Sequence, residues 1–421
     1  ASGDKIYIDD VFSTFLYTGN GNTTRQIQNG LDLATDGGLV WIKDRGQTRA
    51  HYLFDSSTFS SPWNQYLKSN ANSARYSASG TGNSLGGPFL SNGFTTGNNH
   101  NNSSRNICSF SFKKTPGFFD IVTWTGDNNA NRAISHSLGS TPGMILVKNT
   151  SNTYNWAAWH RSIWDTTNYR SLELNTTSPQ NGYNPFWAVS SPTSSNFYVR
   201  SNGANVSGQT YVAYVFAHDD QQFGEAGNAS VIKCDSYTGN GSSTGPEINL
   251  GWEPQWVLIK NASSSEGWLM FDSMRGIVTD GNDLRLEANG ENAEDTNTWL
   301  DLTSTGFKIT RSSGAINDSG DIYVYMAIRR NDGYVGKPPE YGTNVFAMDT
   351  GNGSSTIPAF DSAFPVDFAL VRPPATGNSW NTSARLISEK YLQTNNTSAQ
   401  GSGSNYTFDS NLGWAKGSGN N

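Results

Sequence analysis

The sequence predicts an all-β protein made of tandem β-sandwich repeats, of jelly-roll or lectin-like type and roughly 110 residues each. Three observations lead to this fold class. Two motifs recur in constant register along the chain. Short apolar runs alternate with Gly, Asn, Asp and Ser, as strands alternate with turns. No long stretch shows the apolar stripe of a helix, and the best helical candidate, around Leu284 and Leu286, is short.

The repeat is defined by two motifs that keep their distance from one another. A Thr-Gly motif has its glycines 107, 113 and 112 residues apart, at Gly19, Gly126, Gly239 and Gly351. An apolar run follows each motif and ends in a basic residue after 24, 22, 21 and 21 positions, at Lys43, Lys148, Lys260 and Arg372. We therefore expect an N-terminal extension over 1–10, sandwich repeats over 11–115, 116–225 and 226–336, and a partial fourth repeat over 337–421.

Each repeat offers recognisable strands. The run 39–43 is short, apolar and preceded by Gly37-Gly38, which predicts a central strand buried on both faces. The closing runs 107–112, 211–216 and 322–328 carry large side chains at alternate positions. The Thr-Gly-Asn-Gly motif accepts positive φ and predicts a hairpin turn. The recurring basic residue is expected to be a structural charge at a strand end, with a ligand contact as the alternative.

The connections and the last repeat make two further predictions. Linkers over 114–117, 223–227 and 336–339 are short, so the repeats should form a semi-rigid rod or a compact cluster. The fourth repeat reaches Asn421 without a closing strand. A sandwich without that strand has an open edge, so we expect the natural chain to continue or another chain to supply the strand.

Composition narrows the class of partner. There are 28 basic and 35 acidic residues, for a net charge of -7, and a nucleic-acid-binding domain would be basic. No apolar run is long enough to span a bilayer, so no membrane insertion is expected. Cys108 and Cys234 lie in apolar alternating runs and are expected to be buried strand thiols.

Several stretches resemble repeat domains of virion structural proteins of tailed bacteriophages, in particular tail-fibre-like proteins of marine phages. The resemblance covers nearly the whole chain and rests on three groups of motifs: Ile8-Asp9-Asp10-Val11-Phe12-Ser13 with Gly38-Leu39-Val40-Trp41-Ile42-Lys43, Pro116-Gly117-Phe118-Phe119-Asp120 with Ser137-Leu138-Gly139-Ser140-Thr141-Pro142, and Gly251-Trp252-Glu253-Pro254-Gln255-Trp256. It implies a location on the virion surface and, as partners, other virion proteins and further copies of this chain, for example in a trimer.

Three functions are compatible with this resemblance. The first is a tail-fibre-like appendage that binds host envelope glycans. The second is an architectural capsid-decoration or tail-sheathing protein without sugar binding, and the third is a tailspike-like glycan-degrading enzyme. A glycosidase needs a pair of carboxylates, whereas Asp55 and Asp272 recur singly and the second repeat replaces them. With no His-x-x-x-His or Cys-x-x-Cys spacing either, we do not expect an enzyme.

Two groups of residues are candidates for ligands. Asp280, Asn282 and Asp283 lie in a Gly-containing loop whose oxygens suit calcium, although the same residues are ordinary turn formers. No other cofactor is expected. Aromatic residues in polar contexts are expected first of all to be buried in a core, but they could also stack on sugar rings or anchor a protein interface; they are Trp63, Tyr66, Trp156, Trp187 and Trp299.

Overall fold

The computed structural model describes residues 5–59, 63–77, 85, 87–165, 167, 170–182, 186–353, 357–403 and 406–417. Within these ranges the chain folds into 32 β-strands and four single-turn 3-10 helices, so the all-β prediction is confirmed. Among the residues described, no helix has the length and apolarity needed to cross a bilayer.

Repeat 1 is a sandwich of two antiparallel sheets preceded by the turn η1 (Ile8–Asp10). The large sheet has the order β1-β9-β3-β4-β5-β6, and the small sheet has the order β2-β8-β7. The strands are β1 (Phe12–Thr18), β2 (Arg25–Gln28), β3 (Gly38–Asp44), β4 (Tyr52–Asp55), β5 (Gln65–Lys68), β6 (Tyr76–Ser77), β7 (Phe89–Leu90), β8 (Gly93–Thr96) and β9 (Asn106–Lys113), with the turn η2 (Asn98–His100) before β9.

Repeats 2 and 3 use the same strand order. In repeat 2 the sheets are β10-β16-β12-β13-β14 and β11-β15, formed by β10 (Phe119–Thr125), β11 (Arg132–Ser135), β12 (Met144–Asn149), β13 (Ala157–His160), β14 (Leu172–Glu173), β15 (Asn196–Val199) and β16 (Thr210–Phe216). In repeat 3 they are β17-β25-β19-β20-β21-β22 and β18-β24-β23, formed by β17 (Ile232–Thr238), β18 (Glu247–Asn249), β19 (Pro254–Asn261), β20 (Trp268–Asp272), β21 (Asp283–Glu287), β22 (Asp295–Asn297), β23 (Leu300–Thr303), β24 (Gly306–Ile309) and β25 (Ile322–Arg329).

The closing strand of each of these repeats (β9, β16 or β25) lies between the first strand and the strand that carries the recurring lysine (β3, β12 or β19). Along β25, Tyr323 and Tyr325 belong to the core of repeat 3 itself, whereas Val324 and Met326 belong to a second core that continues into repeats 1 and 2. Both faces of the large sheet are therefore covered. This explains why β3 is buried at every position, as the sequence predicts.

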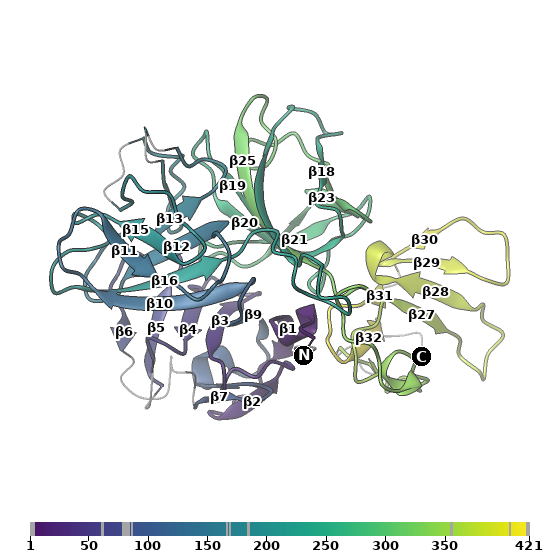
Figure 1. Cartoon of the computed structure of the whole chain (residues 1–421). Helices are drawn as coiled ribbons and strands as arrows, with labels where there is room; N and C mark the ends of the chain where they lie inside the picture. Colours follow the sequence, from purple (N-terminus) through teal and green to yellow (C-terminus); the bar gives the residue numbers. More distant parts are fainter. Residues whose placement is uncertain are drawn as a thin grey trace.

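The first three repeats form a compact cluster, with repeat 1 in purple, repeat 2 in blue and teal, and repeat 3 in green (Figure 1). Their large sheets meet at a shared core. The ring of Phe112 lies 5.6 Å from that of Phe216 in repeat 2 and 6.0 Å from that of Trp256 in repeat 3. The short linkers allowed either a semi-rigid rod or a compact cluster of repeats, and the cluster is the arrangement observed.

The Thr-Gly motif does not form the predicted hairpin. It leads from the large sheet to the small sheet, since β1 and β2 belong to different sheets. A Cβ on Gly19 would lie 2.0 Å from the carbonyl oxygen of Asn102, and one on Gly239 would lie 2.1 Å from that of Asp318. The first glycine of the motif is needed because two backbones approach closely, while positive φ is confined to the second, such as Gly21.

Repeat 4 lies beside the cluster, in yellow (Figure 1). Its sheets have the orders β27-β28-β29-β30 and β26-β32-β31. The elements are η3 (Gly342–Asn344), β26 (Phe360–Asp361), β27 (Phe368–Val371), β28 (Asn381–Ala384), η4 (Arg385–Ile387), β29 (Lys390–Gln393), β30 (Gly401–Ser402), β31 (Tyr406–Thr407) and β32 (Gly413–Lys416). The described part of this repeat has neither a first strand nor a closing strand.

Candidate functional site

The recurring lysines join neighbouring repeats. Lys43, Lys148 and Lys260 are fully buried. Nζ of Lys148 donates to the carbonyl oxygen of Tyr154, at 2.6 Å in its own repeat, and to that of Asn72, at 2.9 Å in repeat 1. Nζ of Lys260 donates in the same way to the carbonyl oxygen of Thr177 in repeat 2, at 3.0 Å. These lysines are structural charges, and each of the two cross-repeat bonds goes to the preceding repeat.

A tryptophan eight residues after the lysine makes a second bond across the same boundary. Nε1 of Trp156 donates to the carbonyl oxygen of Lys68 in repeat 1, at 2.8 Å. Nε1 of Trp268 donates to that of Glu173 in repeat 2, at 3.0 Å. Repeat 1 has His51 at this position, and His51 is fully buried. We call each of these boundaries a seam.

The third seam closes the cluster between repeats 1 and 3. The backbone N–H of Arg49 donates to the carbonyl oxygen of Glu291 at 2.7 Å, and that of Glu294 donates to the carbonyl oxygen of Arg45 at 2.8 Å. The hydroxyl of Ser69 donates to the carbonyl oxygen of Ala288. Repeat 2 therefore contacts repeat 1, repeat 3 contacts repeat 2, and repeat 1 contacts repeat 3, each across one seam. The three repeats form a closed ring.

The recurring carboxylate position also lies between repeats. Oδ2 of Asp55 accepts a bond from the hydroxyl of Tyr214 in repeat 2, at 2.9 Å. His160 replaces the aspartate in repeat 2, and its Nε2 lies 3.1 Å from the carbonyl oxygen of Tyr325 in repeat 3. In repeats 1 and 2 this position therefore contributes to the contacts between repeats.

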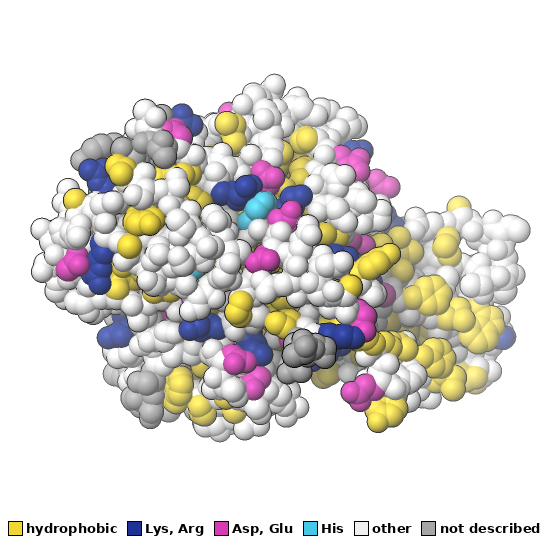
Figure 2. Space-filling model, viewed as in Figure 1, with side chains coloured by type: hydrophobic (Ala, Val, Ile, Leu, Met, Phe, Trp, Pro, Cys, Tyr) yellow, Lys and Arg dark blue, Asp and Glu magenta, His cyan; other side chains and the backbone are white. Residues whose placement is uncertain are grey.

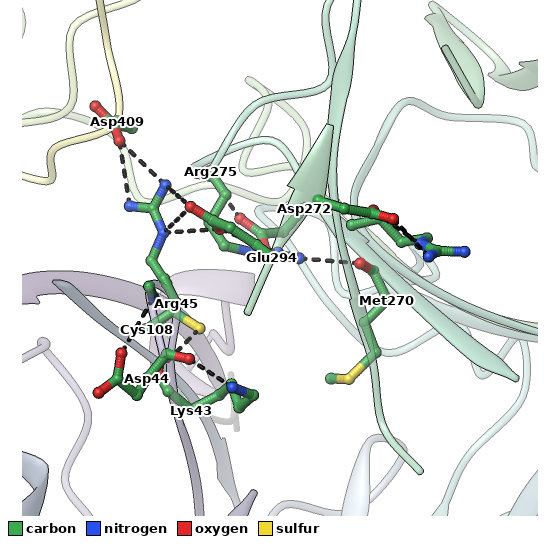
Figure 3. Close-up of polar contacts among 12 residues, drawn as sticks. Lys43, Asp44, Arg45, Cys108, Met270, Asp272, Arg275, Glu294 and Asp409 are labelled. Carbon is green, nitrogen blue, oxygen red and sulfur yellow. Dashed lines mark hydrogen bonds and ion pairs between the residues drawn. The ribbon is translucent and has the colours of Figure 1, made fainter. Parts of the chain in front are cut away.

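At the third seam, charged groups replace these neutral contacts (Figure 3). Asp272 and Arg275 are fully buried and form an ion pair, and the guanidinium of Arg275 lies 5.9 Å from the ring centre of Phe110 in repeat 1. Arg45 binds Glu294 of repeat 3 at 2.9 Å and Asp409 of repeat 4 at 3.2 Å. Arg45 therefore connects three repeats.

Burial shifts the pKa of the seam groups. Loss of hydration lowers the pKa of Lys148 to about 7 and that of Lys260 to about 8. It also raises the pKa of the Asp55 carboxyl, against the opposing effect of its hydrogen bonds. Shifted pKa values often mark catalytic sites. Here the shifted groups are enclosed between sheets and bonded to protein atoms, so burial alone accounts for them.

The candidate sugar-stacking residues do not form a shared surface. Tyr66, Trp156, Trp187 and Trp299 are 5%, 0%, 1% and 4% exposed, so core burial, which the sequence favours for each of them, is what the structure has. Trp63 is half-buried and packs edge-on against Phe89. Trp156 is buried at a seam, whereas Trp299 is buried in the core of repeat 3 itself.

The candidate calcium loop is occupied by its own backbone. Oδ1 of Asp283 accepts the N–H of Val278 at 3.0 Å, and Oδ2 accepts those of Trp299 and Leu300 at 2.8 and 3.0 Å. Burial raises the pKa of Asp283 to about 7. The described residues contain no group of three or more His, Cys, Asp or Glu side chains arranged to hold a metal.

Two surface depressions are small or open. One, of about 60 Å³, lies between repeats 1 and 4 and is lined by Arg45, Asn106 and Asp409, among others. That volume corresponds to roughly two water molecules. The other, of about 270 Å³, is an open polar hollow on repeat 2 lined by Asp120, Ser135 and His136, among others. Neither encloses enough apolar surface for a small-molecule site.

Sequence reasoning missed a buried asparagine in each of the first three repeats. Asn101, Asn205 and Asn317 are fully buried. Nδ2 of Asn205 donates to Oδ1 of Asp127 at 2.6 Å and to the carbonyl oxygen of Asn129 at 2.9 Å, which holds the Thr-Gly loop in place. These asparagines stand six residues before Ile107, Tyr211 and Tyr323, so the constant spacing was the available signal.

Both cysteines are free and buried, as expected. Burial raises the pKa of the Cys108 thiol to about 12, so the thiolate form needed for nucleophilic or metal chemistry is suppressed.

Comparison with known proteins identifies a family but not an activity. The profile of one family, described as a domain of unknown function (DUF7483), matches residues 8–331, and the chain belongs to this family. The matched range coincides with the three-repeat ring, which begins at η1 and ends after β25. Neither a curated protein nor a solved structure matches the chain.

Proposed function

We propose that this member of the DUF7483 family is a non-catalytic structural protein of the virion surface, whose three-repeat ring serves as a rigid building block. The virion assignment is supported by the sequence resemblance to tailed-phage structural proteins. The sequence placed the architectural role second, after glycan binding. The ring supports the architectural role better than it supports glycan binding.

One observation carries the architectural role: all three seams of the ring are closed by polar contacts, and at each seam one donor is a fully buried side chain, Lys148, Lys260 or Ser69. At each seam, main-chain carbonyls of one repeat accept bonds from side chains or backbone of the next. Buried polar groups of this kind are costly unless paired, so they fix one arrangement of the repeats. A ring held in this way resists deformation, which suits a load-bearing part of a particle.

A particle-level experiment tests the proposal. Purified particles of the virus that encodes the chain are analysed by mass spectrometry and by immunogold electron microscopy with antibodies against repeat 3. We expect many copies at regular positions on the particle surface. Absence of the chain from purified particles would overturn the virion role.

Glycan binding is the second candidate, and it is favoured by one exposed indole. Trp380 of repeat 4 is 40% exposed, and the guanidinium of Arg372 lies 5.7 Å from its ring centre. An exposed indole can stack on a sugar face. A bacterial glycan array with the native chain and with Trp380→Ala separates the candidates: selective binding lost in the variant supports a receptor-binding role, and no binding by either protein supports the architectural one.

A further inference from the structure

Two histidines lie in the seam between repeats 2 and 3. His160 is the last residue of β13 and is buried, and His218 lies just after β16 and is half-buried. Both belong to repeat 2, and both form a hydrogen bond with a main-chain group of repeat 3. Figure 2 shows a histidine with acidic and basic side chains around it where these two repeats meet.

His160 has to be neutral to form its two bonds. Its Nδ1 accepts the backbone N–H of Ser162 at 3.2 Å, so this nitrogen carries no proton. Its Nε2 lies 3.1 Å from the carbonyl oxygen of Tyr325 in repeat 3, which can only accept, so Nε2 is the donor. A second proton would have to bind Nδ1, where it would face the N–H of Ser162. Protonation of His160 therefore breaks one bond and places a charge in the seam.

His218 uses the same ring nitrogen directly across the seam. Its Nδ1 accepts the backbone N–H of Cys234 at 3.2 Å. Cys234 belongs to β17, whose only partner strand is β25, so this bond is made at the other edge of β17. Beside it, the N–H of Asp219 donates to the carbonyl oxygen of Ile232 at 2.8 Å. The imidazole of His218 thus occupies the place of a main-chain acceptor, and a proton on Nδ1 removes that acceptor.

Charged groups of both repeats face the two imidazoles. Repeat 2 contributes Arg161 and Asp219, and β17 of repeat 3 contributes Lys233 and Asp235. The two cations oppose a proton on an imidazole, the two carboxylates favour it, and a proton on His218 opposes one on His160. Burial outweighs the carboxylates, because it lowers the pKa of both histidines.

We propose that the seam between repeats 2 and 3 is an acid-sensitive joint of the ring: protonation of His160 and His218 removes the bonds that their Nδ1 atoms accept, and this seam loosens before the other two. The inference rests on the geometry of the ring and not on the proposed virion role.

The other two seams are held by bonds that a proton on an imidazole does not remove. Between repeats 1 and 2, Lys148 and Trp156 donate to carbonyl oxygens. Between repeats 1 and 3, the bonds come from backbone N–H groups and from the hydroxyl of Ser69. His51 also lies near that seam, but its Nδ1 accepts the indole N–H of Trp41, a bond inside repeat 1. Burial lowers the pKa of His51 well below its usual range, so it stays neutral longest.

The direction of the pH dependence follows from the lowered pKa of His160. Burial lowers this pKa to about 4, whereas an exposed imidazole has a pKa of 6.5. A loosened seam therefore binds protons more readily than a closed one. Closure is fully favoured above pH 6.5 and is weakened progressively as the pH falls towards 4. His218 contributes in the same direction.

The test measures hydrogen exchange of the full chain between about pH 7.5 and 5, a range in which ordinary carboxylates stay charged. After correction for intrinsic exchange, protection of the amides of Ser162 and Cys234 should fall at least about tenfold, as expected for a pKa lowered by more than one unit. The amides of Tyr154 and Glu294 report on the other two seams and should change less than about twofold. Unchanged protection at Ser162 and Cys234, or an equal loss at all three seams, would overturn the proposal.

Glutamine variants assign the effect to the two histidines, since a glutamine oxygen accepts the same N–H and does not titrate. His160→Gln combined with His218→Gln should retain at pH 5 the protection that it has at pH 7.5. His136→Gln is the matched control, because Nδ1 of His136 accepts the N–H of Leu138 and its Nε2 lies 3.2 Å from the carbonyl oxygen of Thr193, all within repeat 2. This control should lose protection in acid as the native chain does.

His218→Gln alone replaces only a half-buried side chain, so it keeps the test decisive if the double variant does not fold. It should respond to acid more weakly than the native chain. An acid response of native size in His218→Gln or in the double variant would contradict the joint, as would a response lost equally in His136→Gln.

Discussion

At the residue scale, the buried seam lysines show how a polar side chain can hold two repeats together. The ammonium of Lys148 replaces its hydration by the carbonyl oxygens of Asn72 and Tyr154. The two acceptors lie in different repeats, so the bonds fix the distance between two loops that otherwise belong to separate sheets. The cost of dehydrating the ammonium appears as its lowered pKa.

Lys148→Met should destabilise the ring, because it removes both hydrogen bonds that Nζ donates and leaves the carbonyl oxygen of Asn72 with only the backbone N–H of Tyr154. Each such loss costs about 1–3 kcal/mol, and we expect a decrease of roughly 2–3 kcal/mol in the free energy of unfolding, measured with urea. Lys308→Met, on the small sheet of repeat 3, is the control and should shift the unfolding midpoint little. Equal shifts in the two variants would contradict the role of the seam lysine.

The same lysine predicts a pH dependence. Its folded pKa, about 7, lies below the unfolded value of 10.5, so the unfolded chain binds the extra proton between these limits. The stability linked to Lys148 is therefore present above pH 10.5 and is lost as the pH falls towards 7. The difference in unfolding free energy between native protein and Lys148→Met should grow as the pH is raised from 7 to 10. A constant difference would mean that the buried ammonium keeps its ordinary pKa.

At the element scale, the sequence predicts individual strands but not the contacts between repeats. β3 was predicted as a strand buried on both faces, because its run of apolar residues has no polar face. The sequence does not indicate what covers the second face of each large sheet. Their second cores depend on contacts such as Phe112 with Trp256, across 144 residues of sequence, which no local pattern encodes. For the same reason, no sequence pattern indicates that Trp156 lies at a seam.

The close packing of repeats 2 and 3 can be tested at one glycine. A Cβ on Gly143, just before β12, would lie 2.7 Å from the Cβ atoms of His218 and Cys234, and Cys234 belongs to β17 of repeat 3. Gly143→Ala should therefore lower stability by about 1–3 kcal/mol through overpacking. Gly46→Ala is the control, because nothing lies within 4 Å of its added methyl group. The measurement is the thermal midpoint, and equal midpoints for the two variants would contradict the tight interface.

At the scale of the whole molecule, the ring explains why the family profile ends near residue 331. Three repeats complete the cycle of seams, and repeat 4 attaches from outside through groups such as Asp409, Asn411 and Asp367. The sequence alone predicts the repeats and their short linkers. Short linkers allow a rod of repeats as well as a cluster. The choice between them depends on pairs such as Lys148 with Asn72, which only the folded chain brings together.

Closure of the ring predicts that the linkers are dispensable for its integrity. Residues 225–228, between repeats 2 and 3, are exposed, so a protease site can be inserted there. Repeat 3 contacts repeat 2 through Lys260 and Trp268 and contacts repeat 1 through Glu291 and Glu294. After cleavage, the two fragments should therefore elute together in gel filtration, at the size of the intact chain, and separate only in urea. Fragments that separate in native buffer would mean that the seams do not hold the repeats together without the covalent link.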